Sequence, residues 1–551
     1  MDLYRAFLAI ILSFLILVGY QYFFHRPAPP QQTPQAPSTQ QEGVGAGIQA
    51  LPAPTTSPID GPASVPIDGE ARAIRVDTPM FTAVINEQGG GFKSFVLKEF
   101  RTGIEEDSGP MQLFRPKESV DLPVLFSLDN NGGTSLPSYR AEEASLVLNN
   151  RQDEGKLVMT AQLAEGIRIV RTLTFRGGSY LIDVEYAVEN TTDTPLQISP
   201  ALSLRNEPFA HASPTSQFLF SGPAAYIDGE LDEIKAKRWR DGPVVLQGQV
   251  SWAGYVDNYF MTSVVPPAEG MRLVTVQGSG EQFRTLISEG IRILPARASQ
   301  VYTYKLYFGP KKLEDLKEID SRFGSELAKS VNFGFFNFIA KPMLWLLNFF
   351  HQYSGNYGVA IILLTVLIKL IFWPLSQKGM KSMKNMQKLQ PKVAKLREKF
   401  KGDPSKMNQE MMALYKTYKV NPLGGCLPMI LQLPFFFALY KVLLAAIELR
   451  HAPFMLWIND LSAPDRLWVG FDIPYLHGIP VLTLLMGASM YFQMKMTPTT
   501  ADPMQARIMQ FLPVVFTILF VNFASGLVLY WFINNLLSIL QQYLINRQSK
   551  A

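Results

Sequence analysis

The amino-acid sequence predicts a polytopic α-helical membrane protein with six transmembrane helices, a large extracytoplasmic β-sandwich domain and a cytoplasmic helical hairpin. Three observations lead to this prediction. Uncharged apolar runs occur at the N-terminus and repeatedly in the C-terminal third. Apolar and polar residues alternate with period two in the long segment between them, and one connection between apolar runs is rich in lysine.

The composition excludes several classes of function. A formal net charge of +5 with 18% charged residues does not fit a polybasic DNA-binding protein. A single cysteine, Cys426, excludes an intrachain disulfide and a cysteine metal cluster. The chain has no dinucleotide-binding glycine motif, phosphate-binding loop or hydrolase nucleophile motif, and its histidines lack metalloprotease spacing. We therefore expect no enzyme activity, catalytic residue, cofactor or metal.

The N-terminus predicts a signal-anchor transmembrane helix within residues 1–26. Residues 6–24 carry no charge and, as a helix, would span about 28 Å, close to the hydrocarbon thickness of a bilayer. Arg5 also fits the basic start of a cleaved signal peptide, but no small-x-small cleavage site follows the apolar run. Residues 27–70 are rich in proline and glutamine, which predicts an extended linker.

Residues 71–310 predict the β-sandwich domain. Ile182, Val184 and Tyr186, for example, alternate with polar side chains, and several such segments are separated by glycine, proline, asparagine and aspartate. The aromatic residues of this segment most simply form its core. We expect a structural or docking module here, with a ligand site as the alternative.

Residues 311–354 predict a linker helix followed by an interfacial helix. Residues 311–330 have helical spacing and mixed charge. Residues 331–353 crowd phenylalanine and tryptophan around Lys341 and Pro342 with few charges. This pattern favours an amphipathic helix lying in the membrane interface over a transmembrane helix.

Residues 355–547 predict a core with five more transmembrane helices. Residues 508–545 are too long for one crossing, because about 38 helical residues would extend about 57 Å, and residues 523–526 offer a turn. The predicted spans are residues 355–375, 427–447, 479–494, 508–523 and 527–545.

The basic residues predict the orientation. Residues 377–421 contain twelve lysines and arginines, whereas residues 448–475 contain only Arg450 and Arg466. By the positive-inside rule the first connection, with a hairpin at residues 376–422, lies in the cytoplasm and the second lies outside. Counting spans from there places both termini in the cytoplasm and the β-sandwich domain outside.

Lys369 is the most informative candidate site residue, because it lies within the first span of the core. A charge at the centre of a transmembrane helix costs roughly 2.5–3.5 kcal/mol on insertion scales and usually faces a bundle interior or a hydrated cavity. Snorkelling to the cytoplasmic surface is the alternative. However, Lys378 is nine residues further on, about 13 Å by helical rise, which is farther than a lysine side chain comfortably reaches.

Polar residues of the same and other spans could line one groove with this lysine. Thr365 lies one turn earlier on the same helix face, and Gln432, Tyr530 and Asn534 lie in other predicted spans. For the two amides, an ordinary interhelical hydrogen bond is the alternative. The predicted spans contain no Asp or Glu, whereas ion-coupled carriers usually keep a carboxylate in the membrane.

The basic connection at residues 376–422 predicts a hairpin of two helices with a methionine-rich seam, broken at residues 402–404. Methionine adapts to varied apolar partners, and lysines attract RNA phosphates or anionic lipids. A solvated hairpin that only obeys the positive-inside rule fits equally well. The candidate partner-contact residues are Lys381, Lys384, Lys388 and Lys392.

Several ordered motifs resemble the YidC family of membrane protein insertases, in the form with a large periplasmic domain found in Gram-negative bacteria. The resemblance is strongest over residues 355–547 and looser over the β-sandwich domain. Its most specific stretches are residues 409–416 (QEMMALYK), 420–426 (VNPLGGC), 452–454 (APF), 502–505 (DPMQ) and 525–530 (SGLVLY), with 86–90 (NEQGG) in the β-sandwich domain.

The resemblance implies an insertase and foldase of the cell inner membrane, acting alone or beside the Sec translocon on nascent membrane proteins. It implies a positively charged hydrophilic groove, open to the cytoplasm and to lipid, with Lys369 where the family usually has arginine. Thr365 and Tyr530 match positions that the family associates with substrate contact. The ribosome, the signal recognition particle receptor and anionic lipids are the expected partners of the basic hairpin, and DNA is not.

Two other classes of function stay open. A small-molecule transporter or lipid scramblase could use the same polar cavity, although the chain lacks an intramembrane carboxylate and visible inverted repeats. A structural assembly factor would instead favour an uncharged membrane core, against which Lys369 speaks.

Overall fold

The computed structural model describes most of the chain after the predicted linker. The predicted anchor (residues 1–26), the whole predicted linker (residues 27–70) and residue 71 lie outside the described residues. The described residues are 72–105, 107–114, 122–129, 137–163, 166–209, 220–279, 282–400, 402–418, 427–471, 473–474, 476–496 and 503–548.

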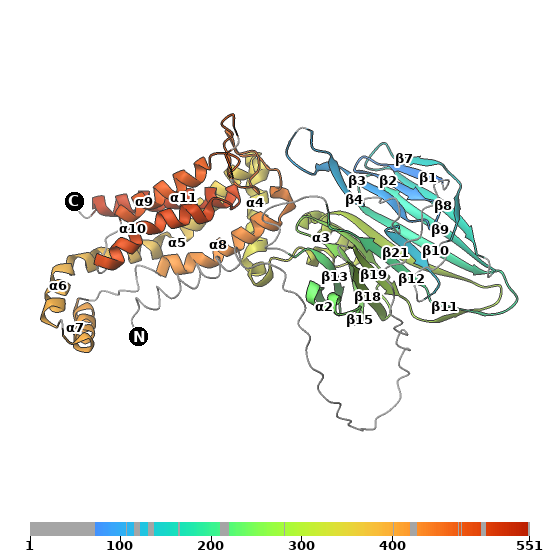
Figure 1. Cartoon of the computed structure of the whole chain (residues 1–551), viewed down its shortest axis with the longest axis horizontal. Helices are drawn as coiled ribbons and strands as arrows, with labels where there is room; N and C mark the ends of the chain where they lie inside the picture. The colour runs from blue at the N-terminus through green and yellow to red at the C-terminus, as the bar shows by residue number, and fades with distance from the viewer. Residues whose placement is uncertain are drawn as a thin grey trace, which may run out of the picture. The chain divides into compact units, whose positions relative to one another are not determined.

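The segment predicted as a β-sandwich folds into β-sheets, here called the β domain (Figure 1). Its largest sheet has nine strands in the order β14 (Glu230–Glu233), β13 (Gly222–Ile227), β16 (Val250–Val256), β17 (Phe260–Val265), β21 (Ser299–Pro310), β10 (Leu181–Asn190), β9 (Ile167–Arg176), β8 (Glu154–Gln162) and β6 (Tyr139–Ala141). One five-stranded sheet has the order β4 (Pro110–Phe114), β3 (Phe92–Arg101), β2 (Phe81–Asn86), β1 (Ala73–Asp77) and β7 (Ser145–Val147). The other has the order β15 (Val244–Gly248), β18 (Arg272–Ser279), β19 (Gln282–Ser288), β12 (Ala201–Asn206) and β5 (Val124–Ser127), and β11 (Leu196–Ile198) pairs with β20 (Arg292–Leu294).

Both five-stranded sheets pack on the same face of the nine-stranded sheet. Tyr186 of β10 lies opposite Tyr302 of β21, so it shares a face with Phe308, six residues further along β21. Phe126 of β5 stacks on Tyr186 with ring centroids 4.0 Å apart, and Phe92 of β3 meets Phe308 edge to face at 5.4 Å. The period-two alternation of the sequence therefore places its apolar set between two layers.

Four helices follow β21 in the described chain before the core, beginning with α3 (Leu313–Phe323). Asp320 fixes the turn after the first of them, because its carboxylate accepts hydrogen bonds from the Ser325 hydroxyl and from the backbone N–H groups of Leu327 and Ala328. These helices are α3 (Leu313–Phe323), η2 (Leu327–Ser330), η3 (Gly334–Phe336) and α4 (Asn337–Ser354), while α2 (Ala236–Arg240) belongs to the β domain.

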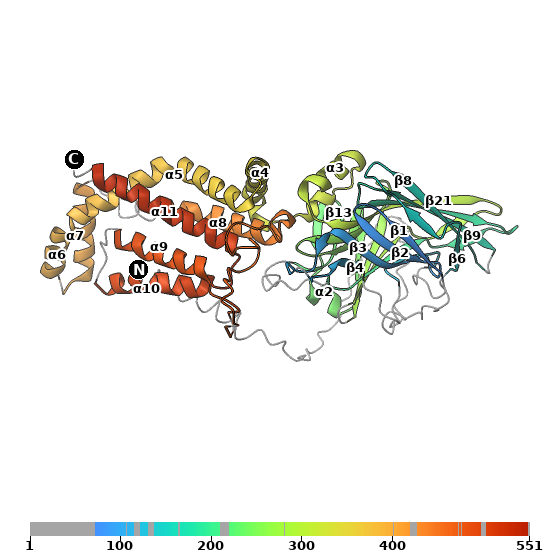
Figure 2. The same ribbon diagram turned by 90° about the horizontal axis from the view of Figure 1, so that it is seen from above.

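Helix α4 is amphipathic, as the aromatic pattern predicts. Met343, Leu344 and Leu347 are buried on one side, whereas Phe338 and Trp345 are exposed on the other. The two views show α4 lying across the long helices of the core, in one view lengthwise and in the other nearly end on (Figures 1 and 2). Its position in a membrane interface stays a prediction.

Among the described residues, the core contains seven further α-helices and one short 3-10 helix. Of the described helices, α5 alone is long and apolar enough to cross a bilayer by length and composition, and shorter apolar stretches occupy residues 431–445 and 510–520. Residues 521–524 separate α10 from α11, so the turn predicted at residues 523–526 overlaps the first two residues of α11. The elements are α5 (Tyr357–Lys388), α6 (Gln390–Lys399), α7 (Pro404–Thr417), α8 (Leu427–Ala445), η5 (Ile447–Leu449), α9 (Val481–Met496), α10 (Pro503–Phe520) and α11 (Ser525–Gln548).

Candidate functional site

The side chain of Lys369 lies between α5 and α11, which pack against each other. Its Nζ donates to Ser538 Oγ at 2.6 Å and to Asn534 Oδ1 at 3.4 Å. Lys369 is half-buried, whereas the next residue, Leu370, is exposed on the outside of the bundle. The lysine is therefore turned toward the helix interface, and its neighbour is turned away from it.

Helix α8 completes the cluster from the other side. Gln432 Nε2 donates to Asn534 Oδ1 at 2.8 Å and to the Tyr530 hydroxyl at 3.2 Å. The carbonyl oxygen of Asn534 thus accepts from both Gln432 and Lys369. The structure brings together four of the five groove residues predicted from the sequence, and we call them with Ser538 the polar cluster.

Thr365, the fifth predicted residue, is placed differently. It lies one turn before Lys369 on α5, but it is only 1% exposed and its hydroxyl donates to the backbone carbonyl of Ile361 at 2.6 Å. Such a bond to the preceding turn is a common way for a helical threonine to satisfy its hydroxyl. Substrate contact at Thr365 stays a prediction.

Sequence reasoning missed three members of the polar stripe along α5 and α11. Ser538 receives the shortest bond from Lys369, and further along the helices Ser376 Oγ donates to Gln541 Oε1 at 3.0 Å. On α11 the polar residues recur at positions 530, 534, 538 and 541, which is the spacing of one helix face. This spacing of polar residues is the feature of the sequence that could have identified Ser538 and Gln541.

The electrostatics of the polar cluster follow from its partners. Both described side-chain acceptors of Lys369 are neutral oxygens, so the positive charge is solvated by dipoles and is not cancelled by a carboxylate. A cation held in this way remains able to attract an anionic group. Among the described residues, no group of three His, Cys, Asp or Glu side chains is placed to hold a metal ion.

The predicted partner-contact lysines differ in their surroundings. Lys381 and Lys388 are exposed on the end of α5. Lys384 Nζ donates to Asn546 Oδ1 of α11 at 3.4 Å, and Lys392 donates to the hydroxyl of Tyr418 beyond α7. Where the end of α5 meets α7, Met386 and Leu389 are buried and pack against Tyr415.

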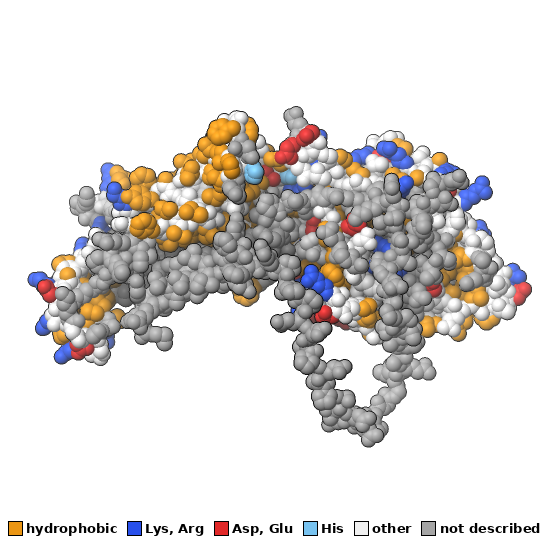
Figure 3. Space-filling view, in the orientation of Figure 1, with side chains coloured by type: hydrophobic (Ala, Val, Ile, Leu, Met, Phe, Trp, Pro, Cys, Tyr) orange, Lys and Arg blue, Asp and Glu red, His pale blue; other side chains and the backbone are white. Residues whose placement is uncertain are grey.

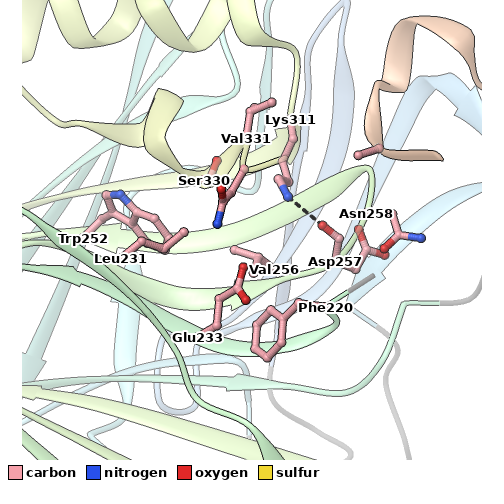
Figure 4. A pocket seen from close by; sticks show the side chains of 12 residues that line it. Phe220, Leu231, Glu233, Trp252, Val256, Asp257, Asn258, Lys311, Ser330 and Val331 are labelled. Carbon is pink, nitrogen blue, oxygen red and sulfur yellow. Dashed lines mark hydrogen bonds between the residues drawn. The ribbon is translucent and has the colours of Figure 1, made fainter. Parts of the chain in front are cut away.

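A small polar cavity lies around Lys311, lined mostly by residues of the β domain (Figure 4). It measures about 30 Å³, enough for about one water molecule. Lys311 Nζ points at the backbone carbonyl of Asp257 and donates to it at 2.8 Å, while Asp257 Oδ1 accepts from the N–H groups of Tyr259 and Phe260. Burial lowers the pKa of Lys311 to about 8, with the charges of Asp257 and Glu233 acting in the opposite direction. This lysine fastens the β16–β17 turn to the end of β21.

Comparison with known families finds two matches that together cover most of the chain. Residues 349–551 match the family described as 60Kd inner membrane protein, and residues 73–346 match the family described as YidC periplasmic domain. The boundary between the matches falls within α4.

Full-length relatives are similar over nearly the whole chain. The membrane protein insertase YidC of Syntrophobacter fumaroxidans is 40% identical, covering 99% of this chain and 100% of the relative. The protein of the same name from Geobacter sulfurreducens is 39% identical over 98% of each chain.

Solved structures give more distant matches. A crystal structure of an active YidC insertase with its first transmembrane domain resolved is 18% identical, covers 87% of this chain and 95% of that chain, and has a TM-score of 0.37. A galactose mutarotase-like protein from Lactobacillus casei is 12% identical, covers 43% of this chain and 99% of that chain, and has a TM-score of 0.32.

Proposed function

The chain belongs to the YidC family of membrane protein insertases, and from this premise we propose that it inserts and helps to fold inner-membrane proteins through a groove built around the polar cluster. The groove is positively charged, hydrophilic, and open to the cytoplasm and to lipid. The protein acts alone or with the Sec translocon, and its substrates are nascent membrane proteins.

The observation that carries the proposal is the hydrogen-bonded cluster of Lys369, Gln432, Asn534 and Ser538 between otherwise apolar helices. Polar groups at this depth shorten the hydrocarbon that a polar substrate tail must cross, since each unsatisfied polar group in hydrocarbon costs several kcal/mol. The uncancelled charge of Lys369 attracts acidic residues of that tail. The apolar segment of the substrate then leaves sideways into lipid, so the groove lowers a barrier without an energy source of its own.

The proposed membrane arrangement has six spans, with residues 6–24 as the first and α5, α8, α9, α10 and α11 as the others. The β domain is periplasmic, and both termini are cytoplasmic. The distribution of basic residues supports this arrangement, because residues 377–421 hold twelve lysines and arginines, most of those in the core.

The basic hairpin is proposed to meet the ribosome, the signal recognition particle receptor or anionic lipids. Lys381 and Lys388 are the better contact residues, because both are exposed. Lys384 and Lys392 already have partners within the chain, Asn546 and Tyr418.

Site-specific photocrosslinking tests the groove. A photoreactive residue at Gln432, which faces the cluster, is compared with one at Leu433, which is exposed on the adjacent side of α8. Ribosome-stalled nascent membrane proteins are expected to crosslink from position 432 and much less from position 433. Equal crosslinking from both positions, or none from position 432 in a folded, membrane-inserted variant, contradicts the groove and favours a transporter or scramblase.

A further inference from the structure

The connection between α8 and α9, residues 446–480, is held firmly at one end of the helical bundle. Asn356 Nδ2, at the start of α5, donates to the Phe454 carbonyl at 2.7 Å. Arg466 donates to the Val521 carbonyl at 2.8 Å, just after α10. The described side chains of this connection therefore have defined positions relative to the helices.

The charged side chains of this connection face inward. Asp465 is buried, and its carboxylate accepts from Trp457 Nε1 at 2.6 Å and from the Thr483 N–H at 3.1 Å. Asp460 Oδ1 accepts from the N–H and hydroxyl groups of Ser462, both at 2.7 Å. Each charged residue described here is buried or half-buried, namely Glu448, Arg450, Asp460, Asp465 and Arg466.

The large apolar side chains face outward instead. Leu456 is 81% exposed, Phe471 64%, Trp468 61% and Met455 50%. Leu456 also has φ 59°, in the left-handed region that bulky residues rarely adopt. A loop that lies in water usually exposes its charged side chains and buries its large apolar ones, and this connection does the reverse. Exposed clusters of large apolar side chains mark an interaction surface.

Two backbone turns present these side chains. The Ile458 N–H donates to the Met455 carbonyl at 3.2 Å and closes the first turn, which carries Met455 and Leu456. Leu467 and Ile479 exchange backbone hydrogen bonds of 2.8 and 2.9 Å and close the second, which carries Trp468 and Phe471. We call Met455, Leu456, Trp468 and Phe471 the apolar tips.

The residues exposed on the neighbouring helices indicate that lipid covers the apolar tips. Large apolar side chains are also exposed on the helices next to the connection, at Leu484 and Leu485 near the start of α9 and at Ile518 near the end of α10. The connection projects from the end of the bundle at which α4 lies, and hydrophobic side chains gather on its projecting part (Figures 2 and 3). Aromatic residues at this level match the belt that membrane proteins place at the lipid–water interface.

We propose that the apolar tips insert into the extracytoplasmic leaflet of the bilayer and form a second interfacial anchor in addition to α4. The inference rests on the proposed function, because it takes α8 and α9 as membrane spans. Anchors on different sides of the bundle fix its depth and limit its tilt, which holds the polar cluster at one level relative to the cytoplasmic surface.

Spin labelling of the full-length protein in phospholipid nanodiscs tests this anchor. The only cysteine is first removed by Cys426→Ser, and nitroxides are attached at Leu456→Cys or Trp468→Cys. Ile518→Cys serves as the lipid-facing reference and Lys93→Cys, exposed on β3, as the water-facing reference. Accessibility to oxygen, which dissolves in lipid, is compared with accessibility to a polar nickel chelate.

We expect the oxygen-to-nickel accessibility ratio at 456 and 468 to exceed that at 93 several-fold and to approach that at 518. A ratio equal to that at 93 means that water covers the tips and overturns the anchor. Protection from both reagents means that a protein surface or a second copy covers them, which also overturns it. A water-like ratio at 518 instead contradicts the spanning arrangement itself, so failure of the anchor and failure of the proposed function give different results.

Discussion

Replacing Lys369 by methionine removes the charge of the polar cluster while keeping a long side chain. At about 6 Å, attraction between this charge and a substrate carboxylate is worth about 0.7 kcal/mol at the dielectric constant of water and about 3 kcal/mol at the effective value near 20 found in proteins. Insertion of a substrate with an acidic translocated tail is therefore expected to slow by about 3-fold to about 100-fold. A substrate with a neutral tail is expected to slow by less.

The cost to folding is expected to be small. Ser538 Oγ still donates to the Asn534 backbone carbonyl at 2.7 Å, and Asn534 Oδ1 still accepts from Gln432 at 2.8 Å. Loss of the bonds from Lys369 then changes the free energy of unfolding by about 1 kcal/mol, which a thermal melt in detergent would reveal as a minor shift.

The assay is protease protection of the translocated tail in proteoliposomes, with acidic and neutral versions of one substrate. Lys369→Arg keeps the charge and serves as the matched control, expected to retain most of the rate. Equal slowing of the acidic and neutral tails by Lys369→Met would refute attraction by charge, and unchanged rates for every substrate would show that the groove works without this residue.

Three further predictions concern the packing and titration of the core. Gln432→Leu removes two neutral hydrogen bonds, leaves Asn534 with fewer donors, and is expected to lower the free energy of unfolding by about 1–3 kcal/mol, read as a lower melting temperature in detergent. Gly487→Leu places a side chain against Thr517, where α9 and α10 approach closely, and is expected to lower the melting temperature more than Gly487→Ala does. Burial raises the pKa of Glu448 from 4.5 to about 7, so the folded state binds its proton more tightly than the unfolded state and loses stability as the pH rises from 5 to 8. Glu448→Gln is expected to flatten this dependence and raise stability at pH 8 by up to about 3 kcal/mol, seen as melting temperatures measured across that range; an unchanged slope contradicts the assignment.

The pattern of apolar and polar residues predicted individual strands and helices better than it predicted which strands pair in a sheet. The alternation around Tyr186 lies in β10, and the aromatic-rich segment near Trp345 forms the amphipathic helix α4. The order of strands in the sheets depends on contacts between distant segments, such as β17 beside β21 and the parallel pair β1–β7, which no local pattern encodes.

The candidate site shows the same division. Lys369 was identifiable because a charge within an apolar run is costly, and that cost is local information. Its partners depend on how α5, α8 and α11 are rotated against one another. Ser538 was overlooked because a helical serine ordinarily satisfies itself on the preceding turn, which it does here while also accepting from Lys369.

The chemistry of the polar cluster suits a passage better than a binding site. A carboxylate beside Lys369 would cancel its charge and compete with the acidic groups of a substrate, whereas the hydroxyl of Ser538 and the amide of Asn534 only solvate it. Attraction of a few kcal/mol is enough to draw a polar tail into the groove. It is also weak enough to be overcome when an apolar segment of about 20 residues, worth about 0.3–0.6 kcal/mol per leucine-like residue at the helix centre, moves into lipid. In the proposed function, sideways release of the substrate therefore follows from the same balance of free energies that admits it.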